Sequence, residues 1–132
     1  MDHTQTVSVE ALLAQAIDVD GTRLIVAEAP AATPPQMRSL IDRLRRQAAP
    51  IAILLASATG SDKVALVAGI SHDLEEQGLH AGHWVREVAK VIGGSGGGKP
   101  SLAQAGGKEV DQLPAALDAA RRQLQEALRD AS

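Results

Sequence analysis

The chain has 132 residues, the length of one domain, and a net charge of −3. It therefore lacks the excess of positive charge that is typical of general nucleic-acid-binding proteins. The sequence is 45% hydrophobic, yet Trp84 is its single aromatic residue. This predicts an aliphatic core and excludes a platform of aromatic rings for stacking single-stranded bases. The absence of cysteine excludes disulfides, thiolate metal sites and cysteine nucleophiles. No apolar run has the length of a membrane span and no signal peptide begins the sequence, so we expect a cytoplasmic protein with no membrane partner.

The first third of the chain predicts two helices around a strand. Residues 7–17 carry apolar residues at helical spacing, and we expect that helix to end before Asp18 and Gly21. Residues 22–29 are a short apolar run typical of a strand. Thr33 is a candidate N-cap, and two prolines follow it in the first turn of the next helix. That helix places one apolar stripe inward and ends at the helix breaker Pro50. The stripe consists of Met37, Leu40, Ile41, Leu44 and Ala48.

The rest of the chain predicts a hairpin and two further helices. Residues 51–59 and 63–71 are continuous apolar runs separated by Gly-Ser-Asp, which indicates a buried β-hairpin. Helical periodicity returns at 83–92 and at 110–128, the latter with a stripe of leucines. Between these helices lies the sequence GGSGGGKPSLAQAGG, residues 93–107, here named the glycine segment. We expect it to be a glycine-rich loop whose second half, SLAQAGG, is extended. The fold class predicted is α/β, a single domain with a small mixed sheet covered by helices.

Three short patterns suggest chemistry, and each has a plainer interpretation. Gly93 to Lys99 matches the spacing of a nucleotide P-loop, but Pro100 stands where that motif needs Ser or Thr to hold magnesium. His80 and His83 could share a helix face as metal ligands, with Glu76 or Glu87 as companions, although exposed histidines at a helix start are the more common case.

The basic run DRLRRQ, residues 42–47, is open to two interpretations. It is either a patch that faces phosphate or a solvated helix face. In the second case, Arg38, Asp42 and Arg46 would form an internal ladder at i, i+4 spacing.

The glycine segment and its flanks resemble the C-terminal domain of alanyl-tRNA synthetases, which is related to a domain of the DHH phosphoesterases. That family shows the pattern GG-x-GGG-[RK]-P-x-x-AQAGG after a helix rich in alanine and valine and before an LPAAL helix, and this chain matches it over roughly residues 22–130. The phosphoesterase relatives have a histidine after the glycines, where this chain has Lys99 and Pro100. Substrate contact of the phosphoesterase kind is therefore not expected.

The resemblance implies a domain that holds the outer corner of alanine-specific tRNA while other domains perform aminoacylation and editing. ATP, and zinc where the parent protein uses it, would belong to those other domains, so no cofactor and no catalytic residue is expected here. Residues 1–20 would end an upstream helical linker and 21–132 would form the domain. Self-association through helices, or a nucleotide-binding accessory role, are the alternatives. The expected nucleic-acid-binding residues are Gly93, Gly94, Gly96, Gly97, Gly98, Lys99, Gln104, Gly106, Gly107 and Lys108.

Closely spaced glycines have two physical explanations. Their N–H groups can receive phosphate or ribose without shielding by side chains, and the lysines around the segment would add charge. Alternatively, the missing side chains allow the segment to pack tightly against its neighbours. The sequence alone leaves both explanations open.

Overall fold

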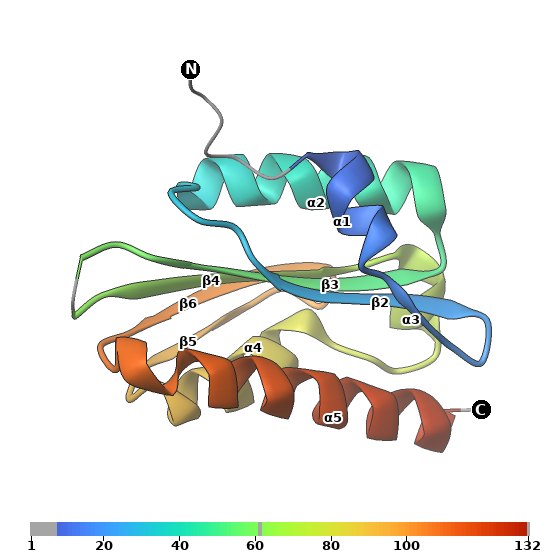
Figure 1. The fold of residues 1–132 in the computed structure, drawn as a ribbon. Helices are drawn as coiled ribbons and strands as arrows, with labels where there is room; N and C mark the ends of the chain where they lie inside the picture. The colour runs from blue at the N-terminus through green and yellow to red at the C-terminus, as the bar shows by residue number, and fades with distance from the viewer. Residues whose placement is uncertain (1–7, 61, 132) are drawn as a thin grey trace.

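A computed structural model describes residues 8–60 and 62–131 of the chain. A six-stranded mixed sheet lies between two layers of helices (Figure 1). The strands are β1 (Ile17–Val19), β2 (Thr22–Glu28), β3 (Ile51–Ala58), β4 (Val64–Ile70), β5 (Ser95–Gly98) and β6 (Leu102–Gly107). The helices are α1 (Val9–Ala14), α2 (Pro34–Ala48), α3 (His72–Glu76), α4 (Ala81–Val91) and α5 (Leu113–Ala131), with a 3₁₀ turn at Val110–Gln112. The α/β mixed-sheet fold expected from the sequence is confirmed.

The strand order across the sheet is β1-β2-β3-β4-β6-β5. Strands β2 and β3 are parallel, because α2 carries the chain back between them, and all other neighbouring pairs are antiparallel. Helices α1 and α2 cover one face, and α4 and α5 cover the other (Figure 1). The glycine segment therefore occupies the sheet edge farthest from β1.

Helix α2 begins as its sequence predicts. The Thr33 side chain accepts a hydrogen bond from the Gln36 backbone N–H at 3.2 Å, and the Gln36 side chain accepts one from the Thr33 N–H at 2.8 Å. This reciprocal capping, with Pro34 at the first helical position, fixes the start of the helix. The five residues of its predicted stripe are all buried.

The predicted hairpin of 51–71 is confirmed as β3 and β4, at the centre of the sheet. Ile51, Ile53 and Leu55 of β3 face α2, while the alternate residues Ala52 and Leu54 face α4 and α5. Every one of these side chains is buried because helices cover both faces, which is why the sequence is apolar without alternation. Ser61, between the two strands in the sequence, lies outside the described residues.

This central position predicts slow hydrogen exchange. We expect the amides of β3 and β4 to exchange only on global unfolding, since both strands are paired on both edges and buried on both faces. Edge strand β5 should exchange faster. Native-state exchange followed by NMR measures this order, and amides in β5 that outlast those in β3 would contradict it.

Three local predictions differ from the structure. The first helix ends at Ala14, and Ile17–Val19 forms the short strand β1, which turns back into β2 through Asp20 and Gly21. Both turn residues have positive φ, 53° and 90°, as an Asp-Gly hairpin turn requires. Helix α4 begins at Ala81, two residues earlier than predicted, and the one-turn helix α3 was not expected.

The first twenty residues were expected to end an upstream linker. Residues 1–7 of that stretch lie outside the described part. Within the remainder, Val9 and Leu12 of α1 are buried in the core cluster of α2.

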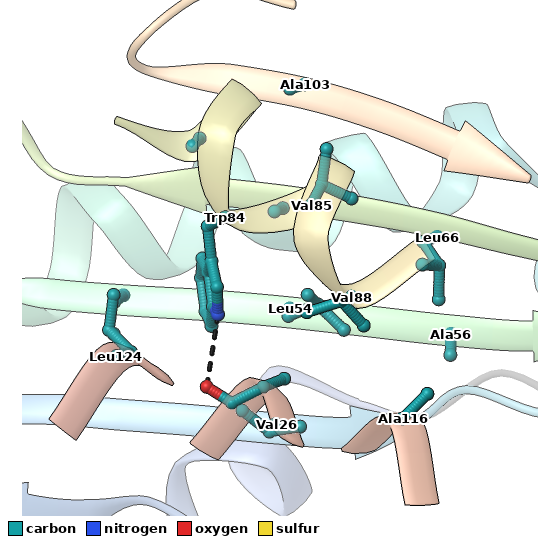
Figure 2. Packing of buried hydrophobic residues seen from close by; sticks show 14 of the residues in the cluster. Val26, Leu54, Ala56, Leu66, Trp84, Val85, Val88, Ala103, Ala116 and Leu124 are labelled. Carbon is teal, nitrogen blue, oxygen red and sulfur yellow. Dashed lines mark hydrogen bonds between the residues drawn. The ribbon is translucent and has the colours of Figure 1, made fainter. Parts of the chain in front are cut away.

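In the opposite helical layer, formed by α4 and α5, Trp84 lies at the centre of the core. Its ring is 6% exposed and packs among aliphatic side chains from β2, β3, α4 and α5, while its indole N–H donates to the carbonyl of Ala120 at 3.1 Å (Figure 2). The leucine stripe of α5 packs into the same core: Leu113, Leu124 and Leu128 are each at most 4% exposed. No helix in the described ranges is both long and apolar enough to span a bilayer.

Candidate nucleic-acid interface

The glycine segment lies between α4 and α5 as expected, but it is a β-hairpin rather than an irregular loop. Strand β5 is Ser-Gly-Gly-Gly, and it pairs with β6 so that Gly97 lies opposite Gln104 and Ser95 lies opposite Gly106. The Lys99 N–H donates to the Leu102 carbonyl at 3.1 Å and closes the turn through Pro100 and Ser101. The extended second half that the sequence predicted is β6. We name residues 95–107 the glycine hairpin.

Four glycines of this segment are required for packing. A Cβ at Gly94 would overlap the Gly106 carbonyl oxygen and lie 2.5 Å from Cα of Gly107. At Gly107 it would lie 2.5 Å from the Ile92 carbonyl oxygen. At Gly96 and Gly98 it would meet Ala105 and Ala103 of the neighbouring strand, the latter at 2.9 Å. These positions therefore support the packing explanation, because no side chain fits the space.

The remaining glycines have other surroundings. Gly93 ends α4 with a φ of 66°, which a glycine adopts without strain, and its N–H donates to the Lys90 carbonyl at 3.2 Å. A Cβ at Gly97 would meet only the flexible end of Arg86, at 3.3 Å, and one at Gly106 would lie 3.3 Å from the Val64 carbonyl oxygen. Gly97, although half-buried, is thus the glycine of the hairpin at which a side chain would fit most easily.

Helix α2 brings two arginines to the hairpin. Arg38 donates to Oε1 of Gln104, 66 residues away in the chain. Two turns later, Arg45 donates to the carbonyl of Ser101 at 2.9 Å, and it also pairs with Asp42. The ladder of Arg38, Asp42 and Arg46, one of the two interpretations of this helix, does not form, because Arg38 contacts Gln104 and Asp42 pairs with Arg45. The expected binding residues did not include either arginine, although Arg45 belongs to the basic run 42–47 that could face phosphate.

The face of the hairpin on the α2 side is open and basic near its turn. Helix α2 packs over β3 and β4, whereas Ser95, Lys99 and Gln104 beyond them are exposed. Lys99 follows β5 at this end of the hairpin, and Gln104 of β6 is the residue that Arg38 contacts, whereas a Cβ at Gly97 would meet Arg86 of α4. A surface of this shape, with small residues flanked by cations, can approach a sugar-phosphate backbone closely.

The other expected residues lie at the far end of the hairpin. Gly93, Gly94, Gly106, Gly107 and Lys108 line an open pocket of about 560 Å³. Lys63, from the tip of the β3–β4 hairpin, lines it too, as do Asp62, Val64 and Ser95. The ten predicted residues therefore divide between two ends of one hairpin rather than forming a single cluster.

Two further polar features concern α4. Lys90 pairs with Glu87 at 2.8 Å, and this hydrogen bond and charge lower the pKa of the Glu87 carboxyl. His80 and His83 stack with ring centroids 3.9 Å apart. Within residues 8–60 and 62–131, no group of three or more His, Asp or Glu side chains could hold a metal ion, so the hypothesis of a histidine metal site gains no support.

The sequence is similar to a known domain family and to proteins that contain it. The DHHA1 domain model matches residues 21–126. The alanine–tRNA ligase of Rhodopirellula baltica is 51% identical over 123 residues, which is 92% of this chain and 13% of that protein. The ligase of Bacillus subtilis is 40% identical over 107 residues, covering 81% of this chain and 12% of that protein. The chain thus spans about an eighth of the length of these relatives.

Solved structures give the same result. The C-Ala domain of Aquifex aeolicus alanyl-tRNA synthetase superposes with a TM-score of 0.72 at 33% identity, covering 84% of this chain and 95% of that domain. A DHH-domain structure from a protein described as a member of a family of ribosomal proteins has a TM-score of 0.62 at 16% identity, which shows the fold alone. The chain therefore belongs to the DHHA1 domain family, in the branch formed by the C-terminal domains of alanyl-tRNA synthetases.

Proposed function

We propose that this domain binds the outer corner of alanine-specific tRNA in the cytoplasm and supports aminoacylation and editing performed by other domains of an alanine–tRNA ligase. The observation that carries the proposal is the exposed hairpin surface around Gln104, flanked by Lys99 and Arg38. Recognition of a folded RNA surface can rest on contacts with the sugar-phosphate backbone and on shape, without stacking rings. The single, buried tryptophan of this chain agrees with that mode.

The charge distribution supports the α2 side as the RNA-facing side. Residues 33–50 hold four arginines and one aspartate, whereas the chain as a whole is acidic. The pocket between α4 and α5, by contrast, is lined by Glu87 and Asp130. A polyanion is attracted to the first surface and repelled by the second. Because only a few cations gather at the hairpin, the salt dependence of binding should correspond to a few phosphate contacts.

Two charge removals test this surface. We expect Lys99→Ala and Arg38→Ala each to weaken tRNA binding by roughly 1 kcal/mol and to flatten the salt slope by about one unit, as the loss of one phosphate contact does. Fluorescence anisotropy with labelled tRNA at several salt concentrations measures both quantities.

Arg122→Ala is the matched control. Arg122 is exposed on α5, in the opposite helical layer, so its removal changes the net charge equally without touching the hairpin. The proposal fails if all three variants weaken binding alike, since the attraction would then be a general charge effect, or if folded Lys99→Ala and Arg38→Ala variants bind as the wild type does.

A further inference from the structure

The first turn of α4 depends on a histidine for its cap. His80 is the N-cap residue, and its Nδ1 accepts a hydrogen bond from the backbone N–H of His83 at 3.2 Å. Its carbonyl accepts the N–H of Trp84 at 3.1 Å. An imidazole nitrogen that accepts a hydrogen bond carries no proton, so this cap requires the neutral ring. Serine, threonine, aspartate and asparagine, the usual N-caps, carry no such condition near neutral pH.

That capped turn touches the glycine hairpin at two points. The N–H of Ala81 donates to the carbonyl of Pro100, in the hairpin turn, at 2.8 Å. Next to it, Gly82 separates the His80 ring from the hairpin backbone. A Cβ there would lie 2.6 Å from the Gly98 carbonyl oxygen and 2.8 Å from Cε1 of His80. The imidazole, the α4 backbone and the strand end at Gly98 are therefore in continuous contact.

The surroundings favour the neutral ring. Desolvation by neighbouring groups, followed by the electrostatic influence of His83 and of Arg86, lowers the pKa of His80, while Glu75 of α3 acts in the opposite direction. Glu87 of α4 and Asp130 of α5 also line the pocket beside the ring. Protonation would also place a cation at the positive end of the helix dipole.

We propose that His80 is a positioning residue for the tRNA-binding surface: by capping α4, it holds the hairpin turn of Gly98 to Leu102 in place. This inference rests on the proposed function only for its last step, the effect on tRNA. Lys99, the second residue of that turn, is the side chain whose position would be lost.

The proposal gives a direction for the effect of pH. A histidine whose pKa is lowered in the folded state stabilises that state above the ordinary histidine pKa of about 6.5, and this contribution is lost as the pH falls below it. Acidification from pH 7.5 to 5 should therefore loosen the first turn of α4 and the hairpin turn. A role of His80 as an RNA-facing charge predicts the opposite, tighter tRNA binding in acid.

Amide exchange on the free domain tests the positioning role without RNA. The reporters are the N–H groups of Ala81 and Lys99, whose acceptors are the Pro100 and Leu102 carbonyls. We expect His80→Ala to lower their protection factors about fivefold to tenfold at pH 7.5, the loss typical of a missing N-cap. His80→Asn, which caps without titrating, should retain wild-type protection at pH 7.5 and keep it at pH 5, where the wild type loses it. His72→Asn, a substitution of an exposed histidine on α3, is the control and should follow the wild type.

Two results would overturn the proposal: unchanged protection of both amides in His80→Ala, or an equal loss of protection between pH 7.5 and 5 in His80→Asn and the wild type. The measurement of tRNA binding is a separate experiment. We expect His80→Ala to weaken tRNA binding several-fold at pH 7.5 and His80→Asn to restore it. If the wild type binds no tRNA, the proposed function fails, whereas the exchange data still decide whether His80 positions the hairpin.

Discussion

Trp84→Ala is expected to destabilise the domain by about 3–5 kcal/mol, the range found when a large buried aromatic side chain is removed. The ring is 6% exposed and contacts both the sheet and α5, so its removal leaves a cavity that fixed strands cannot fill (Figure 2). The Ala120 carbonyl also loses its indole donor. Urea unfolding followed by circular dichroism measures the change, since the variant has no tryptophan to follow by fluorescence.

Trp84→Phe is the matched variant, because it keeps an aromatic ring but cannot donate to Ala120. We expect it to be more stable than Trp84→Ala and less stable than the wild type, because the Ala120 carbonyl loses its donor and the smaller ring packs less completely. An alanine variant within about 1 kcal/mol of the wild type would mean that this ring is not the centre of the α4–α5 layer.

Gly94→Val is expected to be the most damaging substitution in the glycine segment, with a loss of about 3 kcal/mol, the upper end for overpacking. Its Cβ would overlap the Gly106 carbonyl, and neither backbone can move without breaking the pairing of β5 with β6. Thermal unfolding and the amide spectrum of residues 95–107 measure the effect.

Gly97→Ala is the control for Gly94→Val within the same segment. Its Cβ would meet only the end of the Arg86 side chain, although its φ of 156° makes any side chain somewhat strained, at a cost of about 1 kcal/mol. Equal losses in the two variants would show that backbone freedom, rather than lack of space, explains these glycines. If Gly97→Ala remains folded and loses tRNA affinity, that position is needed for binding rather than for packing.

The two explanations of the glycine segment therefore apply to different residues. Gly94, Gly96, Gly98 and Gly107 have backbone or neighbouring side chains within the space of a Cβ, so packing alone accounts for them. At Gly97 a Cβ would meet only the flexible end of the Arg86 side chain, and this glycine pairs with Gln104, which is exposed. Any role of the hairpin in binding should be sought there first, together with Lys99 and Arg38.

The sequence by itself determined the central elements and the family. Helix α2 was predictable because its cap, its prolines and its apolar stripe are local signals spaced along one helix. Strands β3 and β4 were predictable because burial on both faces makes a strand apolar throughout. The pattern of glycines around Lys99 and Pro100 indicated the family, since those positions are set by backbone packing that few other residues permit.

Only the tertiary structure decided the edges of the sheet and the composition of the candidate surface. Strands β1 and β5 have three and four residues, and β5 is largely glycine, so they become strands because neighbouring strands supply their hydrogen bonds. Arg38 reaches Gln104 across 66 residues and Arg45 reaches Ser101 across 56. The contact of His80 with the hairpin likewise depends on how α4 packs under β5 and β6. Contacts of this kind leave no periodic signal in the sequence, because they depend on how two elements pack rather than on how either one forms.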